Sequence, residues 1–416
     1  MLTIALVICC SLLLDWYAFQ SLKTLTANWK KSRASVFLFY WLIMLGSTLN
    51  LSIAFYIAAN SHQPVPPYSM WAITIFLPLF ITKTVLVLTL VTEDIVRFLS
   101  WISNRVSSKT NRNNQYPARR KFISQLGVVL GSIPFAAFVY GIAKGKYDYK
   151  VHRHTLYFED LPEAFDGFTI TQLSDIHSGS FGSASAIQRG IDLANAQKSD
   201  LFVFTGDLIN NLAEEMDSWL AQFRELKAPF GQFSILGNHD YGEYVQWASE
   251  AEKEGNIDRV KAHHKNLDYH LLLNEHTVIE KDGQQIELLG VENWGNGFIQ
   301  RGDLDKALEG TNEESFKILL SHDPSHWEEK VKNHPQKIHL TLSGHTHGAQ
   351  MGIETPTVKW SPIQYRYPHW EGLKTENDRS NYINRGFGVL AFSGRVGVWP
   401  EITVLELRKK SSESVS

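Results

Sequence analysis

The sequence predicts an α/β domain that follows four membrane-spanning helices. Four long apolar segments fill the first third of the 416-residue chain, and short apolar runs alternate with helical segments from about Tyr147 to Leu407. Three of these runs end in His/Asp clusters that are 32 and 31 positions apart, about the length of one strand–helix–strand unit. We therefore divide the chain into a transmembrane anchor (1–145), an α/β domain (146–408) and a polar tail (409–416).

The four apolar segments are each close to the ~20 residues that a spanning helix needs. They cover roughly residues 2–20, 35–59, 70–91 and 122–143. No Lys, Arg, Asp or Glu occurs from Ala34 to Thr82, while Asp15 and Lys83 interrupt the first and third segments, where each is expected to snorkel or to face the bundle interior. Buried core helices of a soluble protein are the alternative, but four such segments without an amphipathic stripe are rare outside membranes.

The loops between these segments predict the orientation of the chain. The second loop carries no charge, whereas the first and third are basic. Their basic residues are Lys23, Lys30, Lys31 and Arg33 in the first loop, and Arg97, Arg105, Lys109, Arg112, Arg119, Arg120 and Lys121 in the third. Because basic loops stay in the cytoplasm, the fourth span delivers the α/β domain to the extracytoplasmic face of the cell membrane. Lys144, Lys146 and Lys150 argue weakly for the opposite orientation.

Within the third loop, Arg119-Arg120-Lys121 precedes an apolar run and resembles a twin-arginine export signal. The two arginines alternatively mark the cytoplasmic end of a span, and both interpretations place the domain outside. We also expect an amphipathic stretch near Asp94–Ser103 and a flexible loop over residues 104–118.

Composition excludes two kinds of site in the α/β domain. The net charge of −3 provides no basic stripe, so no nucleic-acid partner is expected. The two cysteines, Cys9 and Cys10, lie in the first apolar segment, which excludes a disulfide framework and a thiolate metal site. The 16 histidines, together with Asp, Asn and Glu, are the available ligands.

Five apolar runs of the α/β domain end in polar clusters. The clusters are Asp175-Ile176-His177, Gly206-Asp207, Gly237-Asn238-His239-Asp240, His322 and Gly344-His345-Thr346-His347. Parallel strands bring their carboxyl ends to one edge of a sheet, where α/β folds bind ligands. Asp175 and His177, two positions apart, point the same way if the backbone there is extended. The glycines permit a sharp turn and a close approach to a ligand.

Each cluster alone has an ordinary structural explanation. An Asp-x-His occurs by chance, Gly-Asp and Gly-Asn pairs are commonly turns, and a buried histidine is commonly a satisfied core residue. Together, so many buried carboxylates and imidazoles would cost several kcal/mol each without a metal or mutual pairing. The combination therefore indicates a metal site, and imidazole with carboxylate suits Mn, Fe or Zn better than Mg or Ca.

The five clusters resemble the motif set of the calcineurin-like metallophosphoesterases, which is D-x-H, G-D, G-N-H-D/E, a lone His and G-H-x-H in that order. The resemblance covers roughly residues 150–407. The segments Arg385–Gly388 and Trp399–Ile402 are similar to the membrane-associated, exported branch of that family. The resemblance implies a two-sheet α/β sandwich flanked by helices.

The same resemblance implies a role for each motif residue. One of two divalent metal ions (Mn, Fe or Zn) would be held by Asp175, His177, Asp207 and His347. The other would be held by Asp207, Asn238, His322 and His345, with Asp207 as the bridge. His239 would be the general acid and Asp240 would orient it.

The implied function is metal-dependent hydrolysis of a phosphate ester or pyrophosphate bond on a phosphorylated small molecule or a lipid-linked substrate. The family includes UDP-diacylglucosamine pyrophosphatases, and attachment to a membrane favours the lipid-linked class. One alternative is a catalytically silent membrane receptor, although such proteins usually lose ligands and the set here is intact. A transporter is the other, with Asp15 and Lys83 as its only support.

Several further residues are predicted to have no catalytic role. His263, His264, His270 and His276 are expected to be solvated, Asn210 and Asn211 to be helix-start or turn residues rather than ligands, and Asp323-Pro324 to form a turn that aims His322. We expect most of a set of late aromatic residues to pack in the interior, with a substrate groove or a lipid surface as the alternatives. These aromatic residues are Trp294, Phe298, Trp360, Tyr365, Tyr367 and Trp370.

Overall fold

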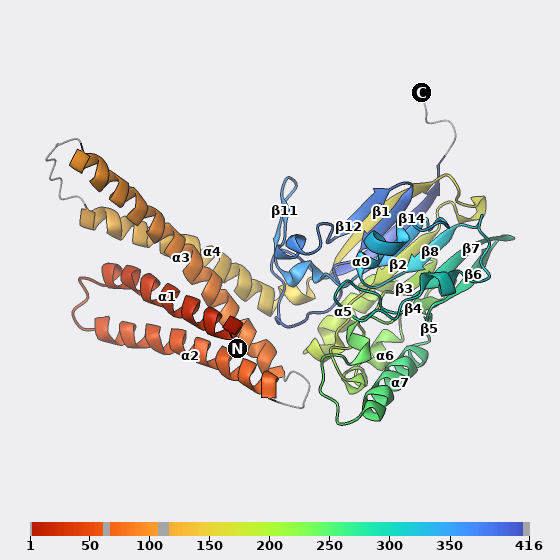
Figure 1. Ribbon diagram of the computed structural model, residues 1–416, viewed down its shortest axis with the longest axis horizontal. Helices are drawn as coiled ribbons and strands as arrows, with labels where there is room; N and C mark the ends of the chain where they lie inside the picture. The colour runs from red at the N-terminus through yellow and green to blue at the C-terminus, as the bar shows by residue number, and fades with distance from the viewer. Residues whose placement is uncertain (1, 61–66, 107–115, 411–416) are drawn as a thin grey trace. The chain divides into compact units, whose positions relative to one another are not determined.

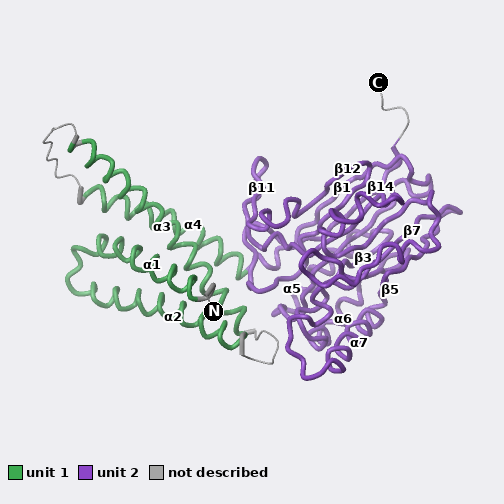
Figure 2. Tube along the Cα trace, viewed as in Figure 1, with its two compact units in different colours: residues 1–61, 65–143 green, residues 62–64, 144–416 purple. Residues whose placement is uncertain are grey.

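The computed structural model describes residues 2–60, 67–106 and 116–410. The chain forms two compact units, one of residues 1–61 and 65–143 and one of residues 62–64 and 144–416 (Figure 2). The boundary between them falls after Ala143, close to the end of the fourth apolar segment.

Unit 1 is a bundle of long apolar helices. The described residues form α1 (Leu2–Leu25), α2 (Arg33–Asn60), α3 (Pro67–Val106) and α4 (Tyr116–Ala143). All four contain a stretch long and apolar enough to cross a membrane, so each of the four predicted segments is a candidate span by length and composition. The stretch near Asp94–Ser103 is not a separate element, because it continues α3. Of the expected loop over residues 104–118, both ends are helical and residues 107–115 lie outside the described part of the chain.

The polar residues that interrupt these helices face the bundle interior. Lys83 Nζ lies 2.7 Å from Asp15 Oδ1 and donates to Ser11 Oγ at 2.7 Å, and Ser11 Oγ lies 3.2 Å from Thr48 Oγ1. Both charged side chains are buried. The apolar bundle therefore encloses an ion pair joining α1 to α3, as expected for ionisable groups at membrane depth.

The paired arginines of α4 contact acidic residues of α3. Arg119 Nε lies 3.9 Å from Glu93 Oε1, and Arg120 Nη1 donates to Asp94 Oδ1 at 3.3 Å. The Arg-Arg pair thus has a packing function within unit 1, whatever its part in export.

Unit 2 contains two mixed six-stranded sheets and a small hairpin among its described residues (Figure 1). The first sheet has the order β1 (Lys150–Phe158), β14 (Glu401–Lys409), β2 (Thr169–Leu173), β3 (Leu201–Phe204), β4 (Gln232–Ser234) and β5 (His270–Leu271). The second has the order β12 (Gly372–Glu376), β13 (Arg379–Ile383), β9 (Leu340–Ser343), β8 (Lys317–Leu320), β7 (Gln284–Gly290) and β6 (Glu275–Lys281). The hairpin is β10 (Ile353–Glu354) and β11 (Lys359–Trp360). This architecture confirms the predicted two-sheet α/β sandwich.

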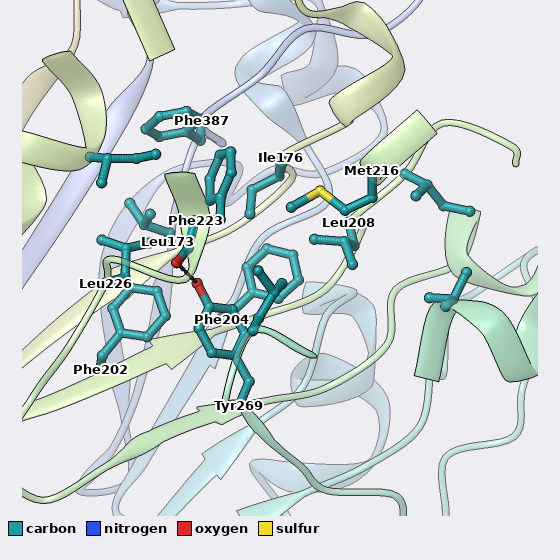
Figure 3. Packing of buried hydrophobic residues seen from close by; sticks show 14 of the residues in the cluster. Leu173, Ile176, Phe202, Phe204, Leu208, Met216, Phe223, Leu226, Tyr269 and Phe387 are labelled. Carbon is teal, nitrogen blue, oxygen red and sulfur yellow. Dashed lines mark hydrogen bonds between the residues drawn. The ribbon is translucent and has the colours of Figure 1, made fainter. Parts of the chain in front are cut away.

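The apolar runs form strands that are buried on both faces. Leu201 and Val203 of β3 pack with Ile318 and Leu320 of β8, so the two sheets share one core. The alternate residues Phe202 and Phe204 belong to a second core on the outer face of the first sheet, as side chains alternate along a strand (Figure 3). Two helices cover that face, α5 (Ala184–Asn195) and α7 (Glu250–Asn266).

Two histidines of α7 differ from the expectation. His263 and His264 are buried rather than solvated. His263 Nε2 lies 3.0 Å from the Ala213 carbonyl oxygen, and His264 Nδ1 lies 2.8 Å from Ser234 Oγ. Because most residues of α7 are polar, the sequence did not indicate that these two histidines lie on the inner face of the helix.

A buried arginine connects several parts of the sandwich. Arg385 Nε donates to Glu401 Oε2 at 2.7 Å, and Arg385 Nη1 lies 2.7 Å from Glu354 and 2.9 Å from Glu371. Burial alone would raise the pKa of Glu401, but the Arg385 guanidinium lowers it to about 2. The ordinary carboxyl value is ~4.3, so Glu401 stays charged in the fold down to acidic pH.

Replacing Glu401 with glutamine is expected to lower the Tm of the full chain in detergent, because breaking a buried ion pair costs about 3–5 kcal/mol. The folded pKa is depressed, so this contribution is complete above pH ~4.3 and is lost as the pH falls toward 2. The difference in Tm between the wild type and Glu401→Gln should therefore narrow below pH ~4.3. The matched control is Glu406→Gln, on the same strand but more exposed. A difference that is equal at pH 7 and pH 3 would contradict the assignment.

Candidate metal centre

Loops that follow five strands meet at one place between the two sheets. In the first sheet, the Asp175 amide donates to the Gly206 carbonyl at 2.9 Å, which joins the ends of β2 and β3. In the second, the Gly344 amide donates to the His322 carbonyl at 2.9 Å and joins the ends of β9 and β8. The His345 amide donates across the sheets to both Asp175 carboxylate oxygens, at 3.0 and 3.1 Å.

The first group of potential ligands is Asp175, His177 and His347, whose ligand atoms all lie within 4.8 Å of one another. His347 Nε2 lies 3.1 Å from Asp175 Oδ1 and 3.0 Å from His177 Nε2. All three side chains are buried. Two residues come from the loop after β2 and one from the loop after β9, so both sheets contribute.

The second group is Asp207, His322 and His345, again within 4.8 Å of one another. His322 Nε2 lies 3.2 Å from Asp207 Oδ2, and His345 Nδ1 lies 2.8 Å from Asn238 Oδ1. Asp207 Oδ2 is also 3.5 Å from His177 Nε2, so this carboxylate lies between the two groups. The structure therefore brings all seven predicted ligands together, with Asp207 between the two groups.

The tautomers of the histidines fit a cation at each group. His322 Nδ1 lies 2.7 Å from the Thr205 carbonyl and His177 Nδ1 lies 3.1 Å from the Ile209 carbonyl, so both neutral imidazoles carry their hydrogen on Nδ1. Their Nε2 lone pairs then face the Asp207 carboxylate. Lone pairs so placed repel one another unless a proton or a metal ion lies between them.

The charge of the site also favours a cation. Burial raises the pKa of Asp207, but the facing His322 imidazole lowers it well below the usual carboxyl range. Burial lowers the pKa of His322, while the Asp207 carboxylate raises it, and the net value is about 10. Without a metal ion, His322 would hold a proton on the side that faces Asp207, which is the place where a metal cation fits.

Backbone conformation at the ligands is unusual. Asp175, His177, Asp207, His345 and His347 all have φ between 46° and 72°, in the left-handed region. Non-glycine residues pay about 1–3 kcal/mol each for such conformations, which persist where surrounding contacts impose them. Asp175 and His177 are thus not on an extended backbone as expected, although they do reach the same group.

Two glycines are needed for these loops to approach so closely. A Cβ on Gly206, whose φ is 95°, would lie 2.6 Å from the Gly237 nitrogen and 2.9 Å from His322 Nδ1. A Cβ on Gly344 would lie 2.4 Å from Asp175 Oδ2. Any side chain at either position would displace a ligand.

The predicted general acid stands beside the first group. The His239 ring centroid is 4.9 Å from that of His177, and the His239 amide donates to Asp207 Oδ1 at 2.8 Å. His239 Nδ1 lies 2.6 Å from the Asn210 carbonyl oxygen. The Nε2 of this half-buried ring is therefore the atom left to exchange a proton.

The expected contact between Asp240 and His239 is not formed. The Asp240 carboxylate instead accepts hydrogen bonds from the backbone amides of Gly237, Asp207, Leu208 and Ile209 at 2.9–3.3 Å. Among the described residues, the imidazole of His239 is oriented by the Asn210 carbonyl. Asp240 therefore fixes the loops after β3 and β4 to each other, and its predicted role was wrong in this respect.

Comparison with known proteins agrees with this geometry. Residues 168–349 match the model of the family described as calcineurin-like phosphoesterase, and residues 1–146 match that of "Probable Calcineurin-like phosphoesterase, transmembrane domain". The chain is 30% identical over 299 residues to the metallophosphoesterase YkuE of Bacillus subtilis, covering 70% of this chain and 98% of YkuE. The chain belongs to the calcineurin-like phosphoesterase family.

Two further relatives are similar to this chain over most of its length. "Transmembrane protein with metallophosphoesterase domain" of Danio rerio is 30% identical over 283 residues, covering 65% of this chain and 60% of that protein. "Phosphodiesterase YaeI" of Escherichia coli is 26% identical over 294 residues, covering 70% of this chain and 99% of YaeI.

This member of the calcineurin-like phosphoesterase family has one further buried carboxylate at its second ligand group. Asp323 Oδ2 lies 3.3 Å from His345 Nε2 and accepts a hydrogen bond from the Tyr367 hydroxyl at 3.2 Å. With its Nε2 hydrogen directed to Asp323, His345 presents the Nδ1 lone pair to Asn238 Oδ1. The Asn238 amide is fixed by a 2.7 Å hydrogen bond from Nδ2 to the Tyr244 hydroxyl. The expected turn at Asp323 is present, because Asp323 Oδ1 caps α9 (Pro324–His326), but it also positions His345.

Replacing Asp323 with asparagine is expected to weaken metal binding by about 10–100-fold, because a carboxylate partner orients a ligating histidine and increases its basicity. The measurement is competition with a chelator, followed by the retained metal. Asp303→Asn is the matched control, since Asp303 caps α8 (Leu304–Leu308) in the same way without a contact to the site. Equal metal affinity in the two variants would rule out a positioning role for Asp323.

Aromatic residues separate into three classes. Phe298 and Tyr367 flank the His345 ring at centroid distances of 4.7 and 5.5 Å, whereas Trp370 is buried as expected. Tyr367 also lines a pocket of about 590 Å³, with Arg366, Lys374, Asn296 and Asn381 among its other walls. Trp360 and Tyr365 are exposed, contrary to the expectation of packing.

Proposed function

We propose that this chain hydrolyses a phosphate ester or pyrophosphate bond with two divalent metal ions (Mn, Fe or Zn), and that its substrate is lipid-linked. The observation that carries the proposal is the pair of adjacent ligand groups with the Asp207 carboxylate facing a histidine of each. Metal ions held there would supply a water of lowered pKa and would clamp the oxygens of the transferred phosphoryl group.

The protein's own residues account for the remaining chemistry. The Asn210 carbonyl holds Nδ1–H of His239, so Nε2 of the protonated ring can donate to the departing oxygen. Asp240 keeps the loop that carries His239 against the loop that carries Asp207. Asp323 holds His345, and through Tyr367 it reaches the adjoining pocket, which provides room and polar groups for the rest of a substrate.

Support for a lipid-linked substrate comes from the anchor. Four candidate spans precede the catalytic unit, and six residues lie between the end of α4 and the start of β1. Attachment of this kind confines the site to the neighbourhood of a bilayer, where phosphorylated lipids are concentrated.

The test is elemental analysis of the purified full chain, coupled to a hydrolysis screen in detergent with Mn²⁺ or Zn²⁺ supplied. The screen includes bis(p-nitrophenyl) phosphate, p-nitrophenyl phosphate and lipid pyrophosphates. We expect about two metal ions per chain and the highest kcat/KM on a lipid phosphate. Cleavage of soluble diesters alone would eliminate the lipid-linked class. A fully metal-loaded chain that cleaves nothing would favour the silent receptor.

We further propose that the catalytic unit lies on the extracytoplasmic face. Support comes from the basic first and third loops, because loops rich in Lys and Arg stay in the cytoplasm. Glu93 and Asp94 partly neutralise Arg119 and Arg120, but acidic residues have little influence on the orientation of membrane helices, so the predicted orientation does not change. A C-terminal alkaline phosphatase fusion should be active in cells and a green fluorescent protein fusion dark. The reverse pattern would place the unit in the cytoplasm.

A further inference from the structure

The hairpin of β10 and β11 is oriented with its charged face inward. It projects from the rest of unit 2 (Figure 1), and its antiparallel register pairs Glu354 with Lys359 and Ile353 with Trp360. Glu354 Oε2 lies 2.7 Å from Arg385 Nη1, and Lys359 Nζ lies 2.8 Å from Glu371 Oε1. Since Arg385 and Glu371 are buried, the charged ends of Glu354 and Lys359 reach toward the body of the domain, while the Lys359 side chain keeps 60% of its surface exposed.

The opposite face of the hairpin is apolar and exposed. Cross-strand partners point to the same side, as do residues two apart, so Ile353, Trp360 and Val358 share the face opposite Lys359. Their exposed fractions are 55%, 38% and 50%, and Tyr365, which follows, is 78% exposed. A hairpin of a water-exposed domain normally has the reverse arrangement. An apolar face turned outward, when apolar residues lie together, marks a surface with a partner.

We propose that the apolar face of Ile353, Val358 and Trp360, together with the exposed Tyr365 of the following 3-10 helix (Pro362–Tyr365), inserts into the interfacial layer of the lipid bilayer. Tryptophan and tyrosine are the residues enriched at that layer, where an apolar ring and a polar edge are both satisfied. The inner ion pairs hold the hairpin, so little conformational freedom is lost on insertion.

Two facts favour a bilayer over a protein partner. Seven Cα–Cα steps connect Ala143 at the end of α4 to Lys150 at the start of β1, a reach of at most about 25 Å. The catalytic unit is therefore held at a bilayer if the helices span one. Four side chains, of which only Ile353 and Trp360 lie on the two-residue strands, also offer far less than the ~800 Å² per partner of a standard protein interface.

The experiment places an environment-sensitive NBD fluorophore on the full chain in nanodiscs that hold one copy. Val358→Cys and Val278→Cys are prepared in a Cys9→Ala, Cys10→Ala background. Val278 of β6 is a matched control, an exposed valine on a strand (40% exposed) outside the hairpin. We expect blue-shifted emission from the label at position 358, with at least about twofold quenching by lipids carrying a nitroxide near the headgroup, and neither effect at position 278.

A third variant separates insertion from the preference of the dye itself. Adding Trp360→Ser to Val358→Cys should reduce the quenching at 358, since it removes the largest apolar side chain of the face. Equal quenching at 358 and 278 would overturn the proposal. A blue shift at 358 without lipid quenching would overturn it too, because it would show that protein covers the face. These readouts do not depend on hydrolysis, so they stand apart from the test of the proposed function.

Discussion

Asp207→Ala is expected to lose both metal ions and to reduce hydrolysis by on the order of 10³-fold or more, because removal of the electrostatic stabilisation of a transition state has effects of this size. Asp207 Oδ2 faces His177 Nε2 at 3.5 Å and His322 Nε2 at 3.2 Å, so one substitution removes the carboxylate that faces both groups. Metal content by elemental analysis and kcat/KM on the best substrate of the screen are the measurements.

A second variant distinguishes the loss of metal ions from the loss of the fold. Asp207→Asn keeps an oxygen that can accept the His239 amide hydrogen bond, yet lacks the charge needed to bridge two cations. It should also fall well below two metal ions per chain. Asp217→Ala is the control, since Asp217 pairs with Arg259 at the surface. Retention of two metal ions by Asp207→Asn would refute the bridging role.

His239→Ala is expected to lower turnover by roughly 10²–10⁴-fold while metal content stays nearly unchanged. His239 belongs to neither ligand group, and its Nδ1 is occupied by the Asn210 carbonyl. Protonation matters most for a poor leaving group, so the loss should be larger for an alkyl phosphate ester than for a p-nitrophenyl ester. Metal loss equal to that of Asp207→Ala would overturn the role assigned to His239, and equal losses on the two esters would argue against proton donation.

Much of this centre could be predicted from the order of residue types along the chain. Asp175, Asp207, Asn238, His322 and His345 each follow an apolar run, and parallel strands bring such positions together whatever the intervening sequence. The four apolar helices followed from the length of the apolar segments, and the two-sheet sandwich was implied by the resemblance of the five clusters to a known family. These features depend on local pattern and on topology, which a single sequence contains.

The contacts that sequence could not supply are tertiary ones. The orientation of His239 depends on a backbone carbonyl, that of Asn210, and every residue has a carbonyl. Asp323 had a sufficient local explanation as a helix cap, and its contact with His345 arises only when the loops after β8 and β9 meet. Left-handed φ at Asp175 and His177 is imposed by neighbouring loops, against the preference of these residues.

The origin of the ligands in different sheets connects metal binding to folding. Each ligand group takes residues from loops of both sheets, so an ion held by either would cross-link two layers that are otherwise joined at that edge by hydrogen bonds, such as that from the His345 amide to Asp175, and by apolar packing. The binding free energy then adds to the free energy of folding by thermodynamic linkage. A shortage of the ion would therefore weaken the contact between the two sheets as well as stop the proposed hydrolysis.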